Sequence, residues 1–407
     1  MYTIIPYQDN FVKFDQVVEC YQIFGNRIVS LVNENTFSFD FVNEWQELVD
    51  QFHSRAGIKV IHLFYEFAVA KELNHHLKEL IQNDYCLGYM ILYRRHNLVS
   101  GESFEKSSVG VTFDASLDQA ISLEDYKDAF DKVYQHLVEG DCYQVNLTNQ
   151  FRFSLTKLSN QSLESVAHHF AHKIWKRDKV GAFGSMTVLS PIQKLLFSNS
   201  PECLLQVEKL SNQKEKFAVR SMPIKGTVKY EDDDNFYEAW NNLISCSKNS
   251  AELDMITDLI RNDLSRLGTP KTKVIKQKVP LRVPGLLHQY SLVEVKVAKT
   301  PRTSALIDKM FAGGSITGAP KKRVMEIIRE IESSQRGFYC GSTIISYKDY
   351  LCSSINIRSM SYDHSRAKLY YGAGGGVTLQ SNFQDEFNEM LMKVRSFSNL
   401  LDFPCGN

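Results

Sequence analysis

The chain lacks the features that mark several large classes of protein. Lys and Arg together number 47, as do Asp and Glu, so the formal net charge is zero and no basic excess favours binding to nucleic acid. No apolar run approaches the roughly 18 residues that a membrane-spanning helix needs, and residues 1–15 lack the basic and apolar regions of a secretory signal. The eight cysteines are widely spaced without a CxxC pair, which favours reduced thiols over a disulfide framework or a zinc site. We therefore expect a cytoplasmic protein with neither a nucleic acid nor a membrane as its partner.

What is present is the composition of an ordinary globular protein, with 43% hydrophobic and 23% charged residues among 407. At about 150 residues per domain, this length predicts two or three domains or one large α/β-type unit. No repeat and no Pro/Gly-rich linker divides the chain. Residues 1–115 have the least regular pattern and contain no chemical motif, whereas the pattern sharpens from Ser122 onward.

Hydrophobic periodicity predicts where the regular elements lie. Ser122 begins a capping box, and apolar residues recur at helical spacing from Tyr126 to Leu137 until Gly140 ends the helix. Residues 142–151 alternate as in a strand that places polar side chains, Gln144 among them, on one face. Further helices are expected at 162–177, 236–247, 249–266, 303–311, 320–334 and 383–401. Further strands are expected at 183–190, 194–198, 202–208, 216–222, 289–298, 338–347, 353–361 and 366–372. Because the strands come in neighbouring groups instead of alternating with helices, we predict an α+β protein built on antiparallel sheets.

Lys225 is the first residue that could carry chemistry, because the segment PIKGT at 223–227 places it between a proline and a glycine after an apolar strand. A lysine in a solvated turn is the plainer interpretation of this short segment. Alternatively, a turn that is fixed by proline and glycine could hold the amine in a pocket. Desolvation would then lower its pKa and leave it unprotonated and nucleophilic.

Three further segments combine polar side chains with structure that could hold them. The segment KNSAELDMITDLIRNDLSRL contains Glu252 and has the apolar stripe of a helix, for which a surface helix with internal ion pairs is the plain interpretation. In GSITGAPKKRVMEII, glycines and hydroxyls lead into a proline at a helix start, where free amides suit an anion. Glu386, Glu389 and Lys393 follow a glycine-rich segment at helical spacing, which alone is an ordinary salt-bridged stripe. Each segment has a plain structural explanation, but their joint occurrence in this order does not.

Together these segments resemble the chorismate-binding enzymes and, within that family, the component I subunits of aminodeoxychorismate synthases. The resemblance implies an α+β fold like that of anthranilate synthase component I, with two antiparallel β-sheets packed together and helices outside. It also implies a poorly matched N-terminal half-sheet or subdomain at 1–115, a chorismate-binding catalytic region at 116–402 and a tail at 403–407. The segments that carry the likeness are GDCYQVNLT (140–148), SPE (200–202), PIKGT (223–227), KNSAELDMITDLIRNDL (248–264), GGSITGAPKKRVMEII (313–328), RGFYCGS (336–342), INIRSM (355–360), GAGGGV (372–377) and EFNEMLMK (386–393).

The resemblance implies amination of chorismate at ring carbon 4. Anthranilate synthases have alanine at the position of Lys225, whereas isochorismate and salicylate synthases have a water-activating lysine at the position of Gln144. Lysine at 225 with glutamine at 144 therefore matches the enzymes in which the lysine attacks ring carbon 2 and ammonia then enters at carbon 4. The implied product is 4-amino-4-deoxychorismate, a precursor in 4-aminobenzoate and folate biosynthesis.

The resemblance also implies a role for each matching residue. Lys225 would be the nucleophile, Glu202 the acid that protonates the departing hydroxyl, and His288, in an H-x-x-S pattern, a contact to the ring region. Magnesium would be held by Glu252 and Glu389, with Glu386 beside them. The residues that would bind the substrate are Ser315, Tyr339, Arg358, Gly374, Gly375 and Lys393.

Two alternatives to this function stay open. The chain could be an anthranilate or isochorismate synthase with an atypical lysine, or a catalytically silent relative that binds chorismate without turnover. For the proposed amination the ammonia must have a source, and none of the eight cysteines lies in the glycine-rich elbow of a glutaminase nucleophile. We therefore expect a separate glutamine amidotransferase subunit as partner, and no lyase domain within the chain.

Overall fold

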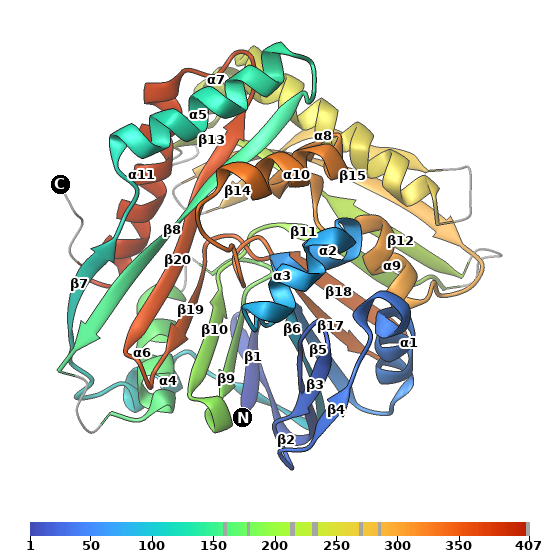
Figure 1. Cartoon of the computed structure of the whole chain (residues 1–407), viewed down its shortest axis with the longest axis vertical. Coiled ribbons are helices and arrows are strands. Elements are labelled where there is room, and N and C mark those ends of the chain that lie inside the picture. The colour runs from blue at the N-terminus through green and yellow to red at the C-terminus, as the bar shows by residue number, and fades with distance from the viewer. Residues whose placement is uncertain are drawn as a thin grey trace.

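A computed structural model describes residues 1–157, 161–176, 180–211, 216–229, 235–267, 272–283 and 286–403. The strands in this part of the chain form one continuous antiparallel network (Figure 1). Its order is β7 (Asp114–Gln119), β8 (Gln144–Thr156), β20 (Lys368–Val377), β19 (Ser359–Asp363), β10 (Lys194–Ser198), β9 (Ser185–Leu189), β1 (Tyr2–Tyr7), β2 (Asn10–Ile23), β6 (Gly88–Val99), β5 (Ile58–Leu63), β17 (Ser342–Tyr347), β18 (Tyr350–Ile355), β11 (Cys203–Lys209), β12 (Phe217–Met222) and β15 (Leu286–Val297).

Five more strands complete the network. β13 (Ile224–Lys229) and β14 (Lys273–Val283) both pair with β15, β3 (Arg27–Ser30) and β4 (Thr36–Ser38) extend from β2, and β16 (Gly318–Ala319) pairs with β8. The predicted α+β class with antiparallel strands is confirmed. The two sheets that we expected are joined edge to edge, because β1 pairs with both β9 and β2.

Helices cover this network, and Figure 1 shows α5, α7, α8 and α10 together across its upper end. The α-helices are α1 (Phe41–Ser54), α2 (Tyr65–Glu72), α3 (Leu77–Gln82), α4 (Glu102–Ser107), α5 (Leu123–Val138), α6 (Leu163–Ile174), α7 (Phe236–Ser245), α8 (Ser247–Ser265), α9 (Thr303–Met310), α10 (Lys321–Ile331) and α11 (Phe383–Leu400). The predicted cap of α5 is confirmed, since the Ser122 hydroxyl accepts a hydrogen bond from the amide of Asp125 at 3.0 Å. Within the described residues no helix has both the length and the apolar character needed to cross a membrane.

Two strand predictions were wrong in their extent. The predicted strand at 338–347 begins only at Ser342, because residues 337–340 form a turn in which Gly337 and Cys340 have positive φ. The predicted strand at 353–361 is interrupted between β18 and β19, where Arg358 has φ +51°. The sequence pattern missed β13 and β14, and β14 pairs irregularly with two register shifts and contains Pro280.

Strands from residues 1–115 are part of the common network. β1 pairs with β9, and β5 pairs with β17, so strand pairing crosses the predicted domain boundary. The boundary itself remains a prediction. Of the predicted tail, Phe403 is buried, whereas residues 404–407 lie outside the described part of the chain. The seven described cysteines have free thiols, and Cys405 is not among them.

A buried polar chain joins these early strands to later ones. His62 on β5 is fully buried, with Nε2 2.9 Å from Thr187 Oγ1 and Nδ1 3.0 Å from Thr343 Oγ1. Thr187 continues the chain to Thr3, which in turn lies 2.8 Å from the Tyr93 hydroxyl. Burial lowers the pKa of His62 to about 3, so the ring is neutral in the folded protein at neutral pH.

We expect this histidine to make the fold sensitive to acid. In the unfolded chain His62 has its ordinary pKa near 6.5, so below that pH the unfolded state binds a proton that the folded state excludes until about pH 3. Stability should therefore fall as the pH drops from 6.5, by about 2 kcal/mol at pH 5. Denaturant unfolding at pH 7 and pH 5 measures this loss. Between pH 7 and pH 5, His62→Gln should lose less unfolding free energy than the unaltered chain. His75→Gln, at an exposed position, should lose as much as the unaltered chain. An equal loss in all three proteins would show that His62 is not the source of the acid sensitivity.

Candidate functional site

Lys225 is the second residue of β13, and Pro223 separates this strand from β12. Both strands pair with the same edge of β15. The pairing of β13 slips by one residue at Gly226, a β-bulge with φ +74°, where any other residue would be strained and its Cβ would lie 2.8 Å from Leu243. PIKGT is therefore a bulged strand and not a solvated turn, and the Lys225 side chain is only 15% exposed.

Glu252 on α8 faces this lysine. Its Oε2 lies 3.2 Å from Lys225 Nζ, and its side chain is 10% exposed. The predicted apolar stripe is confirmed, since Leu253, Ile256 and Leu264 are fully buried, and Glu252, one turn before Ile256, is buried on the same side of α8. A buried ion pair needs favourable geometry to offset the loss of hydration of both charges. The fold therefore brings together the predicted nucleophile and one of the predicted magnesium ligands.

Gly376 on β20 approaches the same lysine from another strand. A β-carbon at this position would lie 3.4 Å from Lys225 Nζ and would overlap Nε2 of Gln144. Gln144, at the start of β8, is fully buried, and neither atom of its amide has a hydrogen-bond partner among the described residues. Buried amides are normally hydrogen-bonded, so an amide like this one is explained by a group that binds beside it.

The two preceding glycines of β20 meet residues from α11. A β-carbon at Gly375 would lie 3.0 Å from Oε2 of the buried Glu386, and Lys393 Nζ donates a hydrogen bond to the Gly374 carbonyl at 2.6 Å. The glycine run therefore presents bare backbone between Lys225 on one side and α11 on the other. Backbone without side chains allows a ligand to approach closely.

Glu202 enters the site from the connection between β10 and β11. It is buried, its amide donates to the Ser200 hydroxyl at 3.1 Å, and its carbonyl accepts from the amide of Ile355 at 3.1 Å. Burial raises the pKa of the Glu202 carboxyl to about 7, against the opposing influence of the neighbouring Ser315 hydroxyl and Lys225 ammonium. A carboxyl that is half protonated at neutral pH can act as a general acid.

His288 on β15 is buried beside the bulge. Its Nδ1 lies 3.2 Å from the carbonyl of Gly226, which can only accept, so we assign the proton of the neutral ring to Nδ1. Burial, together with the positive charge of Arg358, lowers the pKa of His288 to about 4. The ring is therefore neutral at pH 7, with Nε2 as an acceptor.

Arg358 lies between β18 and β19 in a left-handed backbone conformation. Its φ is +51°, and its carbonyl accepts a hydrogen bond from the amide of Asn199 at 3.1 Å. Such a conformation costs about 1–3 kcal/mol for a residue other than glycine and is concentrated at functional sites. Arg358 retains contact with solvent, while partial burial of its guanidinium lowers its pKa below the usual value.

Ser315 and Tyr339 occupy the borders of this region. Ser315 lies in a short 3₁₀ helix, Gly314–Ile316, is buried and neighbours the carboxyl of Glu202. The Tyr339 ring lies against Gly372 on β20, where a β-carbon would overlap the ring. Burial raises the pKa of Tyr339 well above its usual value, so its hydroxyl stays protonated. The predicted substrate roles of both residues remain predictions.

The three carboxylates that the resemblance assigned to magnesium lie on α8 and α11. Glu252 and Glu386 are buried, whereas the Glu389 side chain is half exposed and lies 2.9 Å from Lys393 Nζ. Carboxylate oxygens are the donors that magnesium prefers, so the chemistry of this set fits the ion. In the described residues, however, these carboxylates do not form a group with all ligand atoms within 4.8 Å of one another.

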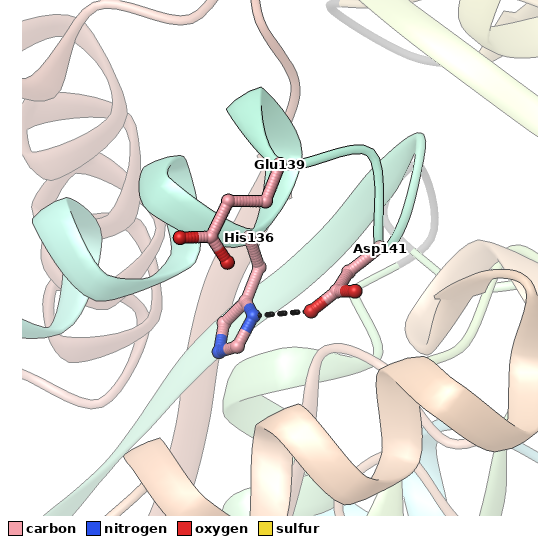
Figure 2. Close-up of side chains that lie close together, drawn as sticks. All are labelled: His136, Glu139 and Asp141. Carbon is pink, nitrogen blue, oxygen red and sulfur yellow. Dashed lines mark hydrogen bonds and ion pairs between the residues drawn. The ribbon is translucent and has the colours of Figure 1, made fainter.

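A different group meets that distance criterion. His136, Glu139 and Asp141, at the end of α5 and in the turn to β8, have ligand atoms within 4.8 Å of one another (Figure 2). His136 Nδ1 lies 2.7 Å from Asp141 Oδ2, and the guanidinium of Arg323 lies 2.7 Å from the same oxygen. Because an arginine already neutralises Asp141, a metal ion would have to compete with it. We assign no ion to this group.

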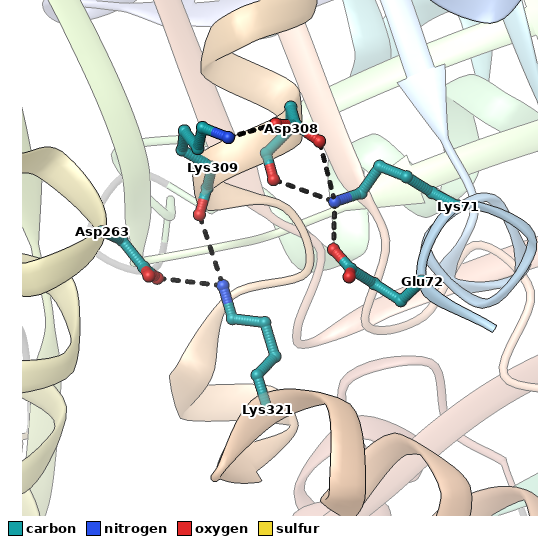
Figure 3. A network of polar contacts seen from close by, with 6 residues as sticks. All are labelled: Lys71, Glu72, Asp263, Asp308, Lys309 and Lys321. Atoms are coloured by element: carbon teal, nitrogen blue, oxygen red, sulfur yellow. Dashed lines mark hydrogen bonds and ion pairs between the residues drawn. The ribbon is translucent and has the colours of Figure 1, made fainter. Parts of the chain in front are cut away.

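A polar network ties α8 to the start of α10. Lys321 Nζ donates to Asp263 Oδ2 at 2.9 Å and lies 3.5 Å from the carbonyl of Lys309 (Figure 3). Asp308 and Lys71 extend these contacts to α9 and α2. The helix that carries Glu252 is thus connected to the segment that follows Ser315.

The sequence interpretation missed two buried charged residues near the site. RGFYCGS, which begins with Arg336, contributed to the resemblance, but neither Arg336 nor Glu66 was given a role. Both are buried, and Glu66 accepts hydrogen bonds from the amides of Arg336 and Gly337. The signal was a charged residue inside the apolar run at 58–70, since charges are almost never fully buried without a partner.

Comparisons with known proteins identify the family of this chain. The model of the family described as chorismate binding enzyme matches residues 35–399. Aminodeoxychorismate synthase component 1 of Salmonella typhimurium is 32% identical over 283 residues, which cover 68% of this chain and 58% of that protein. Its counterpart from Escherichia coli is 31% identical over 284 residues, covering 69% of this chain and 58% of that protein. The chain thus matches less than two thirds of the length of these relatives.

Solved structures share the fold at lower sequence identity. Anthranilate synthase component I from Streptococcus pneumoniae superposes with a TM-score of 0.72 at 18% identity, over 97% of this chain and 93% of that one. A putative 2,3-dihydroxybenzoate-specific isochorismate synthase from Bacillus anthracis gives 0.68 at 15% identity, over 99% and 96%. The predicted fold is therefore confirmed. Since the family model covers most of the sequence, the chain belongs to the chorismate-binding enzyme family.

Proposed function

We propose that this protein aminates chorismate at ring carbon 4 and releases 4-amino-4-deoxychorismate, for 4-aminobenzoate and folate biosynthesis. The observation that carries the proposal is the position of Lys225. Its amine is largely buried, lies 3.2 Å from Glu252 and faces the glycine run of β20, where the space beside Gly376 is also bordered by the amide of Gln144. The names of the Salmonella typhimurium and Escherichia coli relatives support the same reaction.

In the proposed mechanism Lys225 acts as a covalent nucleophile. After Lys225 gives up its proton to solvent, its amine attacks ring carbon 2, the two conjugated ring double bonds shift toward carbon 4, and the bond from carbon 4 to its hydroxyl breaks. Glu202 supplies the proton with which the hydroxyl leaves as water. Ammonia then attacks carbon 4, both ring double bonds shift back, and the bond between carbon 2 and Lys225 breaks with its electron pair returning to the lysine. The ammonium group formed at carbon 4 gives up a proton, which restores Glu202.

The other residues of the site bind and orient the substrate in this proposal. Arg358 and Lys393 pair with its carboxylates, and arginine suits this role because its planar fork binds two oxygens at once. The glycines of β20 and the hydroxyl of Ser315 contact the substrate at close range. His288 stays neutral and adds no positive charge beside the amine that must attack.

We propose that the site uses magnesium, held by Glu252 and Glu389 with Glu386 beside them. The support is the donor chemistry of three carboxylates, two of them buried, close to the lysines that face the glycine run. When bound, the ion would offset the negative charge of a dianionic substrate.

We further propose that ammonia comes from a separate glutamine amidotransferase subunit and that the complex works in the cytoplasm. The relatives are named component 1, which implies a second component for those proteins. The absence of a glutaminase-type cysteine motif from this sequence supports the same arrangement.

A product assay tests this proposal without the partner. The purified chain, chorismate, magnesium and an ammonium salt should yield 4-amino-4-deoxychorismate, identified by chromatography and mass. Omission of the ammonium salt should abolish this product. Anthranilate or isochorismate as the product, or binding of chorismate without turnover, would overturn the proposal.

A further inference from the structure

Arg336 is a buried arginine outside the proposed reaction. It follows α10, and its side chain is 2% exposed. Nε and Nη2 donate to the two carboxylate oxygens of Glu332 at 2.8 and 2.6 Å, and the plane of the guanidinium lies over the Tyr65 ring at 4.5 Å. A buried guanidinium is costly unless its donors are satisfied. Its two remaining hydrogen bonds go to backbone carbonyls of the site.

The same guanidinium bridges two segments of the site. Nη1 donates to the carbonyl of Ile316, next to Ser315, and Nη2 donates to the carbonyl of Asn146 on β8, both at 2.6 Å. The two segments also touch directly, since the amide of Asn146 donates to the carbonyl of Thr317 at 2.8 Å. Arg336 therefore fixes the spacing between the segment of Ser315 and the strand of Gln144.

Glu332 completes this support on the outer edge of β8. Its Oε1 accepts hydrogen bonds from the amide and the hydroxyl of Thr148, at 2.8 and 3.0 Å. On the other edge of β8, Thr148 and Asn146 are the register partners of Gly374 and Gly376. The Glu332–Arg336 pair thus takes the place of a neighbouring strand directly beside the glycine run.

Glu66 anchors the arginine from the N-terminal part of the chain. Its carboxylate accepts from the amide of Arg336 at 2.9 Å and from the amide of Gly337 at 3.0 Å, and it is buried on α2. Together, Glu66, Glu332 and Arg336 form a buried clamp, and none of the three contacts Lys225 or Glu252 in the hydrogen bonds and ion pairs described.

We infer that Arg336 is a positioning residue that holds Ser315 and the Gln144 strand at the spacing needed to bind chorismate, an inference that rests on the proposed function. The requirement is geometric. The guanidinium makes four hydrogen bonds, two to the carboxylate and one to each carbonyl, whereas a lysine keeps the charge but has three donors on a single nitrogen and lacks the planar fork. Small misplacements of binding groups can reduce catalytic efficiency by as much as about 100-fold.

The test compares Arg336→Lys with Arg329→Lys. Arg329 lies on α10, is largely buried and pairs with Glu79 at 2.6 Å, but is not described as touching either segment. We expect Arg336→Lys to weaken chorismate binding by about 10- to 100-fold, measured by calorimetry with magnesium and without ammonia, with every protein also carrying Lys225→Ala so that no covalent bond forms during the titration. Arg329→Lys should bind within twofold of the unaltered chain. Unchanged binding by folded Arg336→Lys, or an equal loss in both variants, would overturn the inference.

A second variant keeps the test decisive if Arg336→Lys does not fold, as judged by circular dichroism and gel filtration. Glu66→Gln retains an acceptor for the Arg336 amide and lies outside the proposed substrate contacts. A loss of chorismate affinity of at least threefold in this variant would support the clamp, and an unchanged affinity would refute it.

Failure of the proposed reaction can be distinguished from failure of the inference about Arg336. If the unaltered chain binds chorismate but makes another product, the proposed amination is overturned and the inference about Arg336 stands. If the unaltered chain does not bind chorismate, both the proposed amination and the inference about Arg336 are overturned.

Discussion

Replacing Lys225 with alanine is expected to slow formation of 4-amino-4-deoxychorismate by on the order of 10³-fold or more, because the variant lacks the nucleophile that splits the reaction into two steps. The measurement is the initial rate with saturating chorismate, magnesium and ammonium salt. Lys278→Ala is the matched control, since Lys278 is also ion-paired to α8, through Asp254 at 2.6 Å, and has no proposed role. This control should retain the rate of the unaltered chain.

Lys225→Arg separates nucleophilic from electrostatic action. Arginine retains a positive charge that can pair with Glu252, but it stays protonated and cannot form the covalent bond. We therefore expect it to be as slow as the alanine variant. Substantial activity in Lys225→Arg would indicate that the site needs only a cation at this position, and an unaffected rate in Lys225→Ala would remove the residue from the mechanism.

Glu202→Gln is expected to reduce the rate by about 100- to 1,000-fold, because an amide cannot protonate the departing hydroxyl. The pH dependence follows from the raised pKa of Glu202, which burial brings to about 7. Below pH 7 the carboxyl carries its proton and is competent. Above pH 7 it ionises, so kcat/KM should fall about tenfold for each further pH unit.

The control for this prediction is Glu208→Gln, on β11, the strand that directly follows Glu202, where the carboxylate pairs with Arg220 at 2.7 Å. Its rate and pH profile should match those of the unaltered chain. The residual rate of Glu202→Gln should lack the decline above pH 7. A variant that retains this decline would show that another group is responsible for it.

Local patterns in the sequence predicted much of this fold. The helices α5, α8 and α11 follow from apolar spacing, with a predicted cap at α5, since each buries one face. The chemistry of the site was predicted only after the separate motifs were considered together, because PIKGT alone is compatible with a solvated turn. The bulge at Gly226 and the position of Lys225 facing Gly376 arise from pairing between strands that are distant in sequence.

The remaining features depend on tertiary contacts that one sequence does not reveal. The interruption at Arg358 falls inside a run that alternates like a strand, and a hydrogen bond from Asn199 helps to hold it. The clamp around Arg336 joins Glu66 to a residue 270 positions later in the chain. No local periodicity indicates which buried charges will meet, so residues of this kind are visible only in the folded structure.

The covalent bond to Lys225 is tested most directly by intact mass spectrometry of the protein with chorismate and magnesium in the absence of ammonia. The account predicts a species heavier by the mass of chorismate less one water, located on the peptide that contains Lys225, and absent from Lys225→Ala. Addition of ammonium salt should discharge it as 4-amino-4-deoxychorismate. An enzyme that forms this product while no such species appears on Lys225, under rapid quenching as well as at steady state, would contradict the account.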